Sequence, residues 1–185
     1  MHRLFVAIDL PENVKEALGD LQVGLPGAGW TSFDTLHLTL RFIGDVDTVQ
    51  ADEIDAALGT VRETSFEVVL AGLGLFGSRR RARILWVGVK PSPPLERLKH
   101  KIDAALSGAG VAHETRKFAP HVTLARLAGA GMAEVQAFID QGLVETGSVA
   151  PLADLRVPVT GFGLYSSILT SSGAIHTLEV GYPLA

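Results

Sequence analysis

Hydrophobic and polar residues alternate in several short stretches of this chain, which predicts β-strands because successive side chains of a strand point to opposite faces. Alternating or short, continuously apolar stretches predict strands over residues 3–9, 36–43, 66–70, 84–89, 121–126, 155–164 and 175–180, with a bend at 72–77. Apolar residues at helical spacing behind capping residues or prolines predict helices over about 12–23, 47–58, 91–106 and 132–141. Strands and helices do not follow the strict alternation of a doubly wound parallel sheet, which favours the α+β class.

The pattern His-apolar-Thr-apolar occurs twice, as HLTL at residues 37–40 and as HVTL at residues 121–124. In a strand, the histidine and the threonine of each copy share one face, and the apolar residues point into a core. One such tetrapeptide arises by chance in roughly one chain in ten, and two arise in fewer than roughly one in a hundred. The repetition therefore indicates one shared site rather than two accidental matches.

The two motifs carry the groups that acid–base chemistry at phosphorus requires. The ordinary pKa of histidine lies near neutrality, so one imidazole can remove a proton from water while another, on the opposite side, protonates the leaving oxygen. Thr39 and Thr123 reach the same space and can donate their hydroxyls to non-bridging phosphate oxygens. Together with His37 and His121, they form the predicted centre of a phosphate site that uses no metal.

A phosphate site also favours an arginine, and the sequence offers two candidates. Arg41 continues the alternation of His37 and Thr39, so it is expected on the same face of the strand. Arg126 is the fifth residue after His121, so a regular strand turns it to the other face, and only a bulge or the end of the strand brings it back. Alternation alone therefore favours Arg41.

Composition narrows the class of protein. Of the 185 residues, 47% are hydrophobic and 19% are charged, which is typical of a compact globular chain. The absence of cysteine excludes disulfides, thiolate metal sites and cysteine nucleophiles, and it fits a cytoplasmic protein. No segment approaches the roughly 18 consecutive apolar residues of a membrane helix, and the N-terminal segment over residues 1–9 is too short and too soon interrupted to be a signal peptide. We therefore expect a cytoplasmic protein without membrane contact.

The net charge of −4 does not suggest a general nucleic-acid binder, but the basic residues are clustered. The clusters comprise Arg79, Arg80, Arg81 and Arg83; Arg97, Lys99 and Lys101; and Arg116 and Lys117. A protein that binds only the end of a nucleic acid needs a local positive patch rather than a basic overall charge. Arg81 is accordingly a candidate substrate contact, whereas the second cluster is equally well explained as a solvated face.

The two motifs are separated by close to half the chain. Each is preceded by a predicted helix and loop and followed by a further predicted helix. This arrangement predicts an internal duplication, in which two similar lobes face each other across a cleft and each contributes one His-Thr pair.

Alternative sites find weaker support in the sequence. A zinc ion bound by the two motif histidines and by Asp34 or Asp45 lacks any recognised ligand spacing. The glycines of residues 72–77 lack the strand–turn–helix context of a dinucleotide fingerprint. The remaining histidines are interpreted as structural; they are His2, His100, His113 and His176.

The two tetrapeptides HLTL and HVTL resemble the signature of the 2H phosphoesterases. The wider pattern is similar to that of the bacterial and archaeal RNA 2′,3′-cyclic phosphodiesterases, also called 2′–5′ RNA ligases. The resemblance extends over nearly the whole chain, through LFVAIDLP, LHLTLRFIGDV, GLFGSRRRARILWVGV, FAPHVTLARL and a final strand ending in YPL.

The resemblance implies one bilobal α+β domain over residues 1–185, with pseudo-twofold symmetry, mostly antiparallel sheets, flanking helices and an active-site cleft between the lobes. It also implies opening of 2′,3′-cyclic phosphate ends of RNA to 2′-phosphate ends, with neither metal nor cofactor. His121 would be the general base that activates water, and His37 the general acid that protonates the leaving 3′-oxygen. The near-symmetry of the site allows these roles to be exchanged.

The same resemblance assigns the phosphate ligands. Thr39 and Thr123 would hold the phosphate, and the family pattern adds Arg126 to the candidate Arg41. The choice between the two arginines stays open, because alternation and the family pattern disagree.

We expect the substrate to be an RNA end or a small cyclic nucleotide, bound by a monomer with no obligate protein partner. Phe42 and Phe118 are candidates for stacking on a base, as are Phe76 and Trp86, and each serves equally well as a core residue. Two other functions stay open. One is a module that binds nucleotides without turning them over; the other is an RNA ligase acting in the reverse direction, which the excess of water disfavours.

Overall fold

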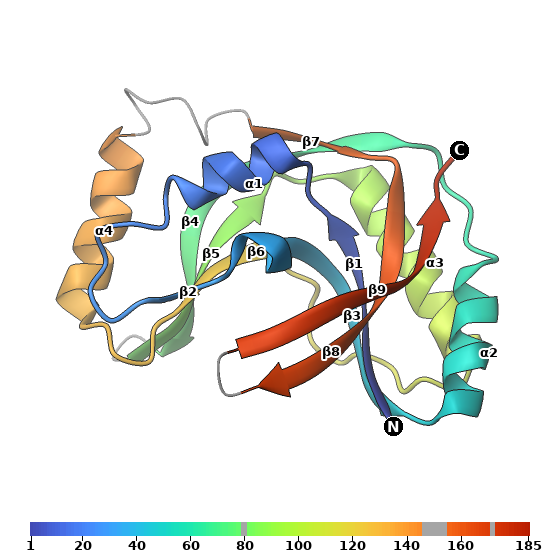
Figure 1. Cartoon of the computed structure of the whole chain (residues 1–185). Coiled ribbons are helices and arrows are strands. Elements are labelled where there is room, and N and C mark those ends of the chain that lie inside the picture. The colour runs from blue at the N-terminus through green and yellow to red at the C-terminus, as the bar shows by residue number, and fades with distance from the viewer. Residues whose placement is uncertain (79–80, 146–154, 171–172) are drawn as a thin grey trace.

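One curled antiparallel sheet flanked by four helices makes up the computed structural model, which describes residues 1–78, 81–145, 155–170 and 173–185 (Figure 1). The strands are β1 (His2–Asp9), β2 (Gly29–Trp30), β3 (His37–Val46), β4 (Phe66–Ser78), β5 (Arg81–Val89), β6 (His121–Arg126), β7 (Leu155–Val159), β8 (Gly161–Thr170) and β9 (Gly173–Pro183). The helices are α1 (Glu12–Gly19), α2 (Thr48–Leu58), α3 (Pro93–Gly108) and α4 (Met132–Glu145), and a 3₁₀ turn (Phe33–Thr35) precedes β3. None of the described helices is long and apolar enough to cross a membrane.

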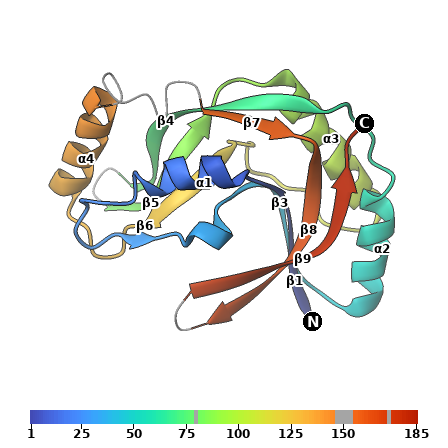
Figure 2. The same ribbon diagram turned by 45° about the horizontal axis from the view of Figure 1, so that its top comes forward.

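The order of the strands is symmetric about the middle of the sheet. Neighbours run β7-β4-β5-β6-β3-β1-β8-β9, with β2 paired to β6, and these pairings are antiparallel. The strands that carry the two motifs, β3 and β6, lie at the centre, and three strands follow each of them outward. A pseudo-twofold axis between β3 and β6 therefore relates β1 to β5, β8 to β4 and β9 to β7. In Figure 2, α4 lies beside one half of the sheet, and α2 and α3 lie beside the other.

Capping residues begin two of the helices, as the sequence predicts. The Asp47 carboxylate accepts a hydrogen bond of 2.8 Å from the backbone N–H of Gln50 at the start of α2. The Ser92 hydroxyl accepts one of 3.4 Å from the backbone N–H of Leu95, and Pro93 occupies the first turn of α3. Both helices pack apolar faces against the sheet, and the resulting core includes the fully buried Leu38.

The structure differs from the predicted elements at two strands. The bend expected at 72–77 is part of β4, because Gly72 adopts a φ of +70° at a shift in register and the strand pairs with β5 on both sides of it. The single strand expected over 155–164 is divided into β7 and β8 at Thr160. A period-2 pattern identifies extended chain but carries no signal for such a break.

Candidate active site

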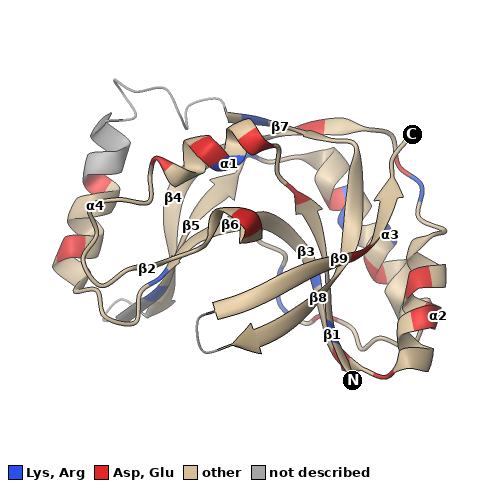
Figure 3. Cartoon of the chain, viewed as in Figure 1, with Lys and Arg blue, Asp and Glu red and all other residues tan. Residues whose placement is uncertain are grey.

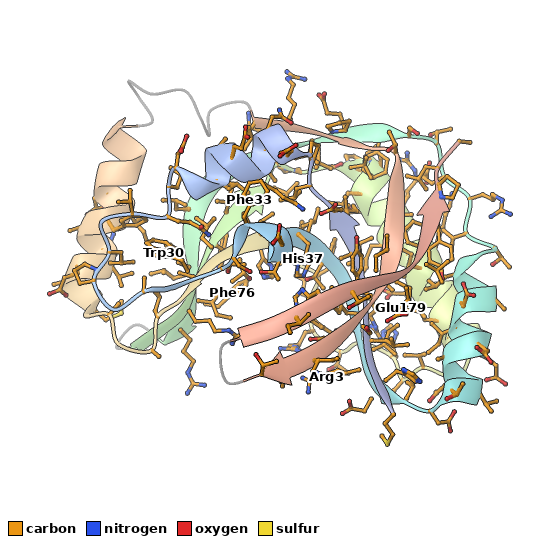
Figure 4. All side chains as sticks on the ribbon, in the orientation of Figure 1. Arg3, Trp30, Phe33, His37, Phe76 and Glu179 are labelled. Atoms are coloured by element: carbon orange, nitrogen blue, oxygen red, sulfur yellow. The ribbon has the colours of Figure 1, made fainter. Side chains whose placement is uncertain are left out.

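The two His-Thr motifs meet at the centre of the sheet. Leu38 of β3 pairs with Val122 of β6, and both side chains are fully buried. One residue further along in each direction, this antiparallel register brings each motif's histidine opposite the threonine of the other motif. The histidines and threonines therefore share the face of the sheet that is not buried by the core, and all four are partly exposed. Figure 4 shows His37 near the centre of the curled sheet.

The backbone holds both imidazoles in the same way. The Nδ1 atom of His37 lies 2.6 Å from the carbonyl oxygen of Thr35, and that of His121 lies 2.7 Å from the carbonyl oxygen of Ala119. A carbonyl only accepts hydrogen bonds, so each Nδ1 donates, and Nε2 is the unprotonated nitrogen of the neutral ring. In each motif the acceptor lies two residues before the histidine. The two half-sites thus present equivalent Nε2 atoms.

His37 differs from a solvent-exposed histidine in its affinity for a proton. Burial lowers the pKa of His37 to about 4, against the opposing effect of the hydrogen bond to Thr35. The nearby His176 and His121 lower the pKa further, whereas Asp9 raises it. In the neutral ring, Nε2 of His37 accepts a hydrogen bond from the Thr39 hydroxyl at 2.9 Å. His37 is therefore uncharged at neutral pH in the free protein.

Aromatic rings form the walls around His37. The ring of Phe5 lies against it with centroids 5.1 Å apart. The ring of His176 meets the His37 ring edge-on at 5.1 Å, and the Tyr165 ring stacks on Phe5 with centroids 5.3 Å apart. The sequence predicts a structural role for His176 and gives no signal for Phe5 or Tyr165. These residues come from β1, β8 and β9, and no local pattern signals that these strands bring them to His37.

Two other aromatic rings form the walls around His121. The ring of Phe76 meets it edge-on at 4.7 Å, and Trp86 lies 6.2 Å away. Both residues were candidates for stacking on a base, and in this structure both contact His121.

A bulge in β3 moves Arg41 away from the motif face. Thr39 pairs with Ala7 and Arg41 with Val6, so Leu40 is an extra residue with no partner on β1. Alternation is therefore reversed after Thr39, and the expectation that Arg41 shares the face of His37 is wrong.

Arg41 is instead buried among groups of α3 and the loop after it. Its guanidinium donates to the carbonyl oxygen of Ala112, and its Nη1 lies 3.5 Å from Asp103. Asp103 also accepts from Lys99 at 2.5 Å, and Phe118 lies 5.5 Å from the Lys99 ammonium. A cation held this way stabilises the packing of α3 on β3 and has no path to the motif face.

An equivalent bulge in β6 turns Arg126 toward the motif face. Thr123 pairs with Trp86 and Ala125 with Leu85, so Leu124 is the extra residue and Arg126 returns to the face of Thr123. Arg126 is exposed there. A bulge was the condition under which the sequence allowed Arg126 to reach the site, and the structure meets it.

The two bulges make the half-sites equivalent residue by residue. From histidine onward, both motifs follow one burial pattern, in which the fourth and fifth residues are buried and the sixth is exposed. Ala125 is therefore the counterpart of Arg41, and Phe42 is the counterpart of Arg126. Phe42 is 61% exposed and lies 6.1 Å from Phe5.

The remaining predicted substrate contacts are Phe118 and Arg81. Phe118 packs against the core and the Lys99 side chain rather than against either motif. Arg81 belongs to β5, but its side chain lies outside the described residues, as do Arg79 and Arg80. Within the described chain, no three His, Cys, Asp or Glu side chains gather as a metal site.

A surface hollow of about 390 Å³ lies beside the motifs rather than between them. Its walls include Asp9, which pairs with His37 across β1 and β3, and Tyr165, but neither motif histidine. Acidic residues lie on α1, α2 and α4, and Asp34 lies on the 3₁₀ turn directly before β3 (Figure 3).

A model of the LigT-like phosphoesterases matches residues 8–86 and again residues 87–176, so each match contains one motif. The chain belongs to this family. The doubled match agrees with the two related halves of the sheet, and it confirms the expected 2H-type family and the α+β fold.

Relatives of this LigT-like protein are similar over most of its length. A protein of Aeropyrum pernix named RNA 2′,3′-cyclic phosphodiesterase is 38% identical over 146 residues, which cover 77% of this chain and 78% of the relative. One of Thermotoga maritima with the same name is 34% identical over 182 residues, or 94% and 91% of the two chains. The crystal structure of Escherichia coli LigT complexed with 3′-AMP matches with a TM-score of 0.79 and 26% identity, covering 100% of this chain and 98% of that one.

The contrasting places of the two arginines predict contrasting effects on stability. Arg41→Ala should lower the free energy of unfolding by about 3 kcal/mol, because it breaks a buried ion pair and leaves the Ala112 carbonyl without its donor. Arg126→Ala removes an exposed side chain and should change it by less than about 0.5 kcal/mol. Urea denaturation measures both. Equal effects of the two substitutions would contradict the bulge in β3.

Proposed function

We propose that this protein hydrolyses 2′,3′-cyclic phosphate ends of RNA, or small cyclic nucleotides, to 2′-phosphates by metal-independent catalysis with two histidines. The observation that carries the proposal is the pair of equivalent imidazoles, in each of which a backbone carbonyl holds Nδ1 and makes Nε2 the accepting nitrogen. The names of the Aeropyrum and Thermotoga relatives support the substrate, and the binding of 3′-AMP by E. coli LigT supports a nucleotide site.

The reaction needs one proton to be removed and one to be supplied. Water attacks phosphorus as His121 takes its proton, the bond from phosphorus to the 3′-oxygen breaks, and His37 protonates that oxygen. The Thr39 and Thr123 hydroxyls donate to the non-bridging oxygens, and the Arg126 cation offsets their charge. The phosphate then remains on the 2′-oxygen.

His37 must gain a proton before it can act as the acid. In the free protein its pKa is about 4, so at neutral pH the ring is uncharged. A phosphodiester anion bound against Nε2 favours the charged imidazole and raises this pKa. The substrate therefore brings the acid into its working state, and Thr39, whose hydroxyl donates to Nε2 in the free protein, becomes available to the phosphate.

Phe42 is the described aromatic residue best suited to stack on the base. It is exposed, and the bulge places it on the face of His37 beside Phe5. We further propose that the two halves form one bilobal domain over residues 1–185 that acts as a monomer.

Removal of either imidazole should abolish most of the activity. His37→Asn and His121→Asn should each lower kcat on an oligonucleotide with a 2′,3′-cyclic phosphate by about 10²–10⁴-fold, the range for general acid–base catalysis. His100→Asn, at an exposed position of α3, is the control. The wild-type product should carry its phosphate on the 2′-oxygen, and EDTA should not change the rate.

Full turnover in either histidine variant would rule out the two-histidine mechanism. Tight binding of the cyclic nucleotide by the wild type with no product after long incubation would instead favour a binding module.

A substrate with a better leaving group distinguishes the histidine that acts as general acid from the one that acts as general base. In a cyclic phosphate with sulfur in place of the 3′-bridging oxygen, the leaving thiolate needs no proton. We expect this substrate to restore most of the activity of His37→Asn and little of that of His121→Asn. Rescue of His121→Asn alone would reverse the two roles.

A further inference from the structure

The two motif histidines are held alike by the backbone but differ in the ring that meets their edge. His121 is met by the phenyl ring of Phe76, with centroids 4.7 Å apart and planes at 86°. His37 is met by the imidazole of His176, with centroids 5.1 Å apart and planes at 73°. One half-site therefore has an apolar wall where the other has a titratable one.

His176 is an unfavourable choice if its only task is to fill space. It lies on β9 opposite Ser167 of β8, and its ring also packs edge-on against Phe5 at 4.9 Å. Its Nδ1 atom is buried and has no hydrogen-bond partner among the described residues. A buried polar atom without a partner costs about 1–3 kcal/mol, and a phenyl ring would fill the same space without this cost. The imidazole nitrogens at this position therefore point to a function.

We propose that His176 is a positioning residue for His37, which makes the two matched half-sites chemically unequal. The proposal rests on the two-histidine function proposed above. His176 does not replace either motif histidine, because it acts through the ring of His37. Since it belongs to the hairpin of β8 and β9, it also links that hairpin to the reacting centre.

The charges around His37 explain how His176 acts. Burial has the largest effect and lowers the pKa of His37; a positive charge on His176 or His121 lowers it further, and Asp9 raises it. Tyr165, on β8, stays uncharged because burial raises its pKa to about 12. Burial also lowers the pKa of His176, so that ring is neutral at pH 7 and becomes a cation only in acid. Its charge then opposes a proton on His37.

The substitution His176→Phe tests this proposal, because it places beside His37 a phenyl ring like the one that Phe76 places beside His121. Without the neighbouring cation, the pKa of His37 should rise by roughly half a unit, measured by NMR titration of its imidazole nitrogens. The limb of the pH profile of kcat/KM that follows His37 should move to higher pH by the same amount, a change of about threefold in activity on that limb. His176→Gln, which removes the charge but keeps a polar group, should give the same upward shift.

The control is His100→Phe, on the exposed side of α3, which should move neither the titration nor the pH profile. If His176→Phe fails to fold, His176→Gln carries the test alone. An unchanged midpoint for His37 in folded variants would overturn the proposal, because a residue that only fills space leaves that midpoint where it is. The NMR measurement needs no turnover. It therefore separates this proposal from the proposed function, which fails if the wild type does not hydrolyse cyclic phosphates.

Discussion

The antiparallel pairing of β3 with β6 at Leu38 and Val122 is the contact on which the rest of the site depends. Both side chains are fully buried, so the core strongly disfavours any other register. A slip by one residue would expose these apolar side chains and bury the histidines and threonines. The hydrophobic core, which has no part in the chemistry, thus determines that two imidazoles and two hydroxyls occupy one face of the sheet.

The bulges in β3 and β6 determine which face of the sheet the residues after each motif threonine occupy. Each inserts one extra leucine after the motif threonine and reverses the alternation beyond it. In both motifs the bulge turns the fifth residue into the core and the sixth onto the motif face. Arg41 is a fifth residue and lies against α3, whereas Arg126 is a sixth residue and lies on the motif face. Asp103 pairs with the Arg41 cation, whereas Arg126 is exposed on the motif face. A duplicated backbone with different side chains produces an asymmetric site.

Much of the fold and the centre of the site could be predicted from the sequence, because both depend on local patterns. Short windows show the two His-Thr tetrapeptides, the capping residues Asp47 and Ser92, the apolar run of β1 and the alternation along β3 and β6. They do not show the bulges at Leu40 and Leu124, since the residues on either side of a bulge look like ordinary strand. Alternation therefore placed Arg41 on the motif face and Arg126 off it, the reverse of what the structure shows.

The surroundings of the histidines could not be predicted for a different reason. Phe5, Tyr165 and His176 are brought to His37 by pairings between the two ends of the chain. An isolated histidine near the C-terminus carries no signal of its neighbours. Its edge contact with His37 appears only when β9 is placed beside β8, and β8 beside β1.

The most direct measurement is an NMR titration of the imidazole nitrogens with adenosine 2′-phosphate, a product of the proposed reaction. The Nε2 resonances of His37 and His121 should shift together and saturate with one dissociation constant, while those of His100 stay unchanged. A response from only one of the two motif histidines, or two different dissociation constants, would contradict a single phosphate site shared by β3 and β6.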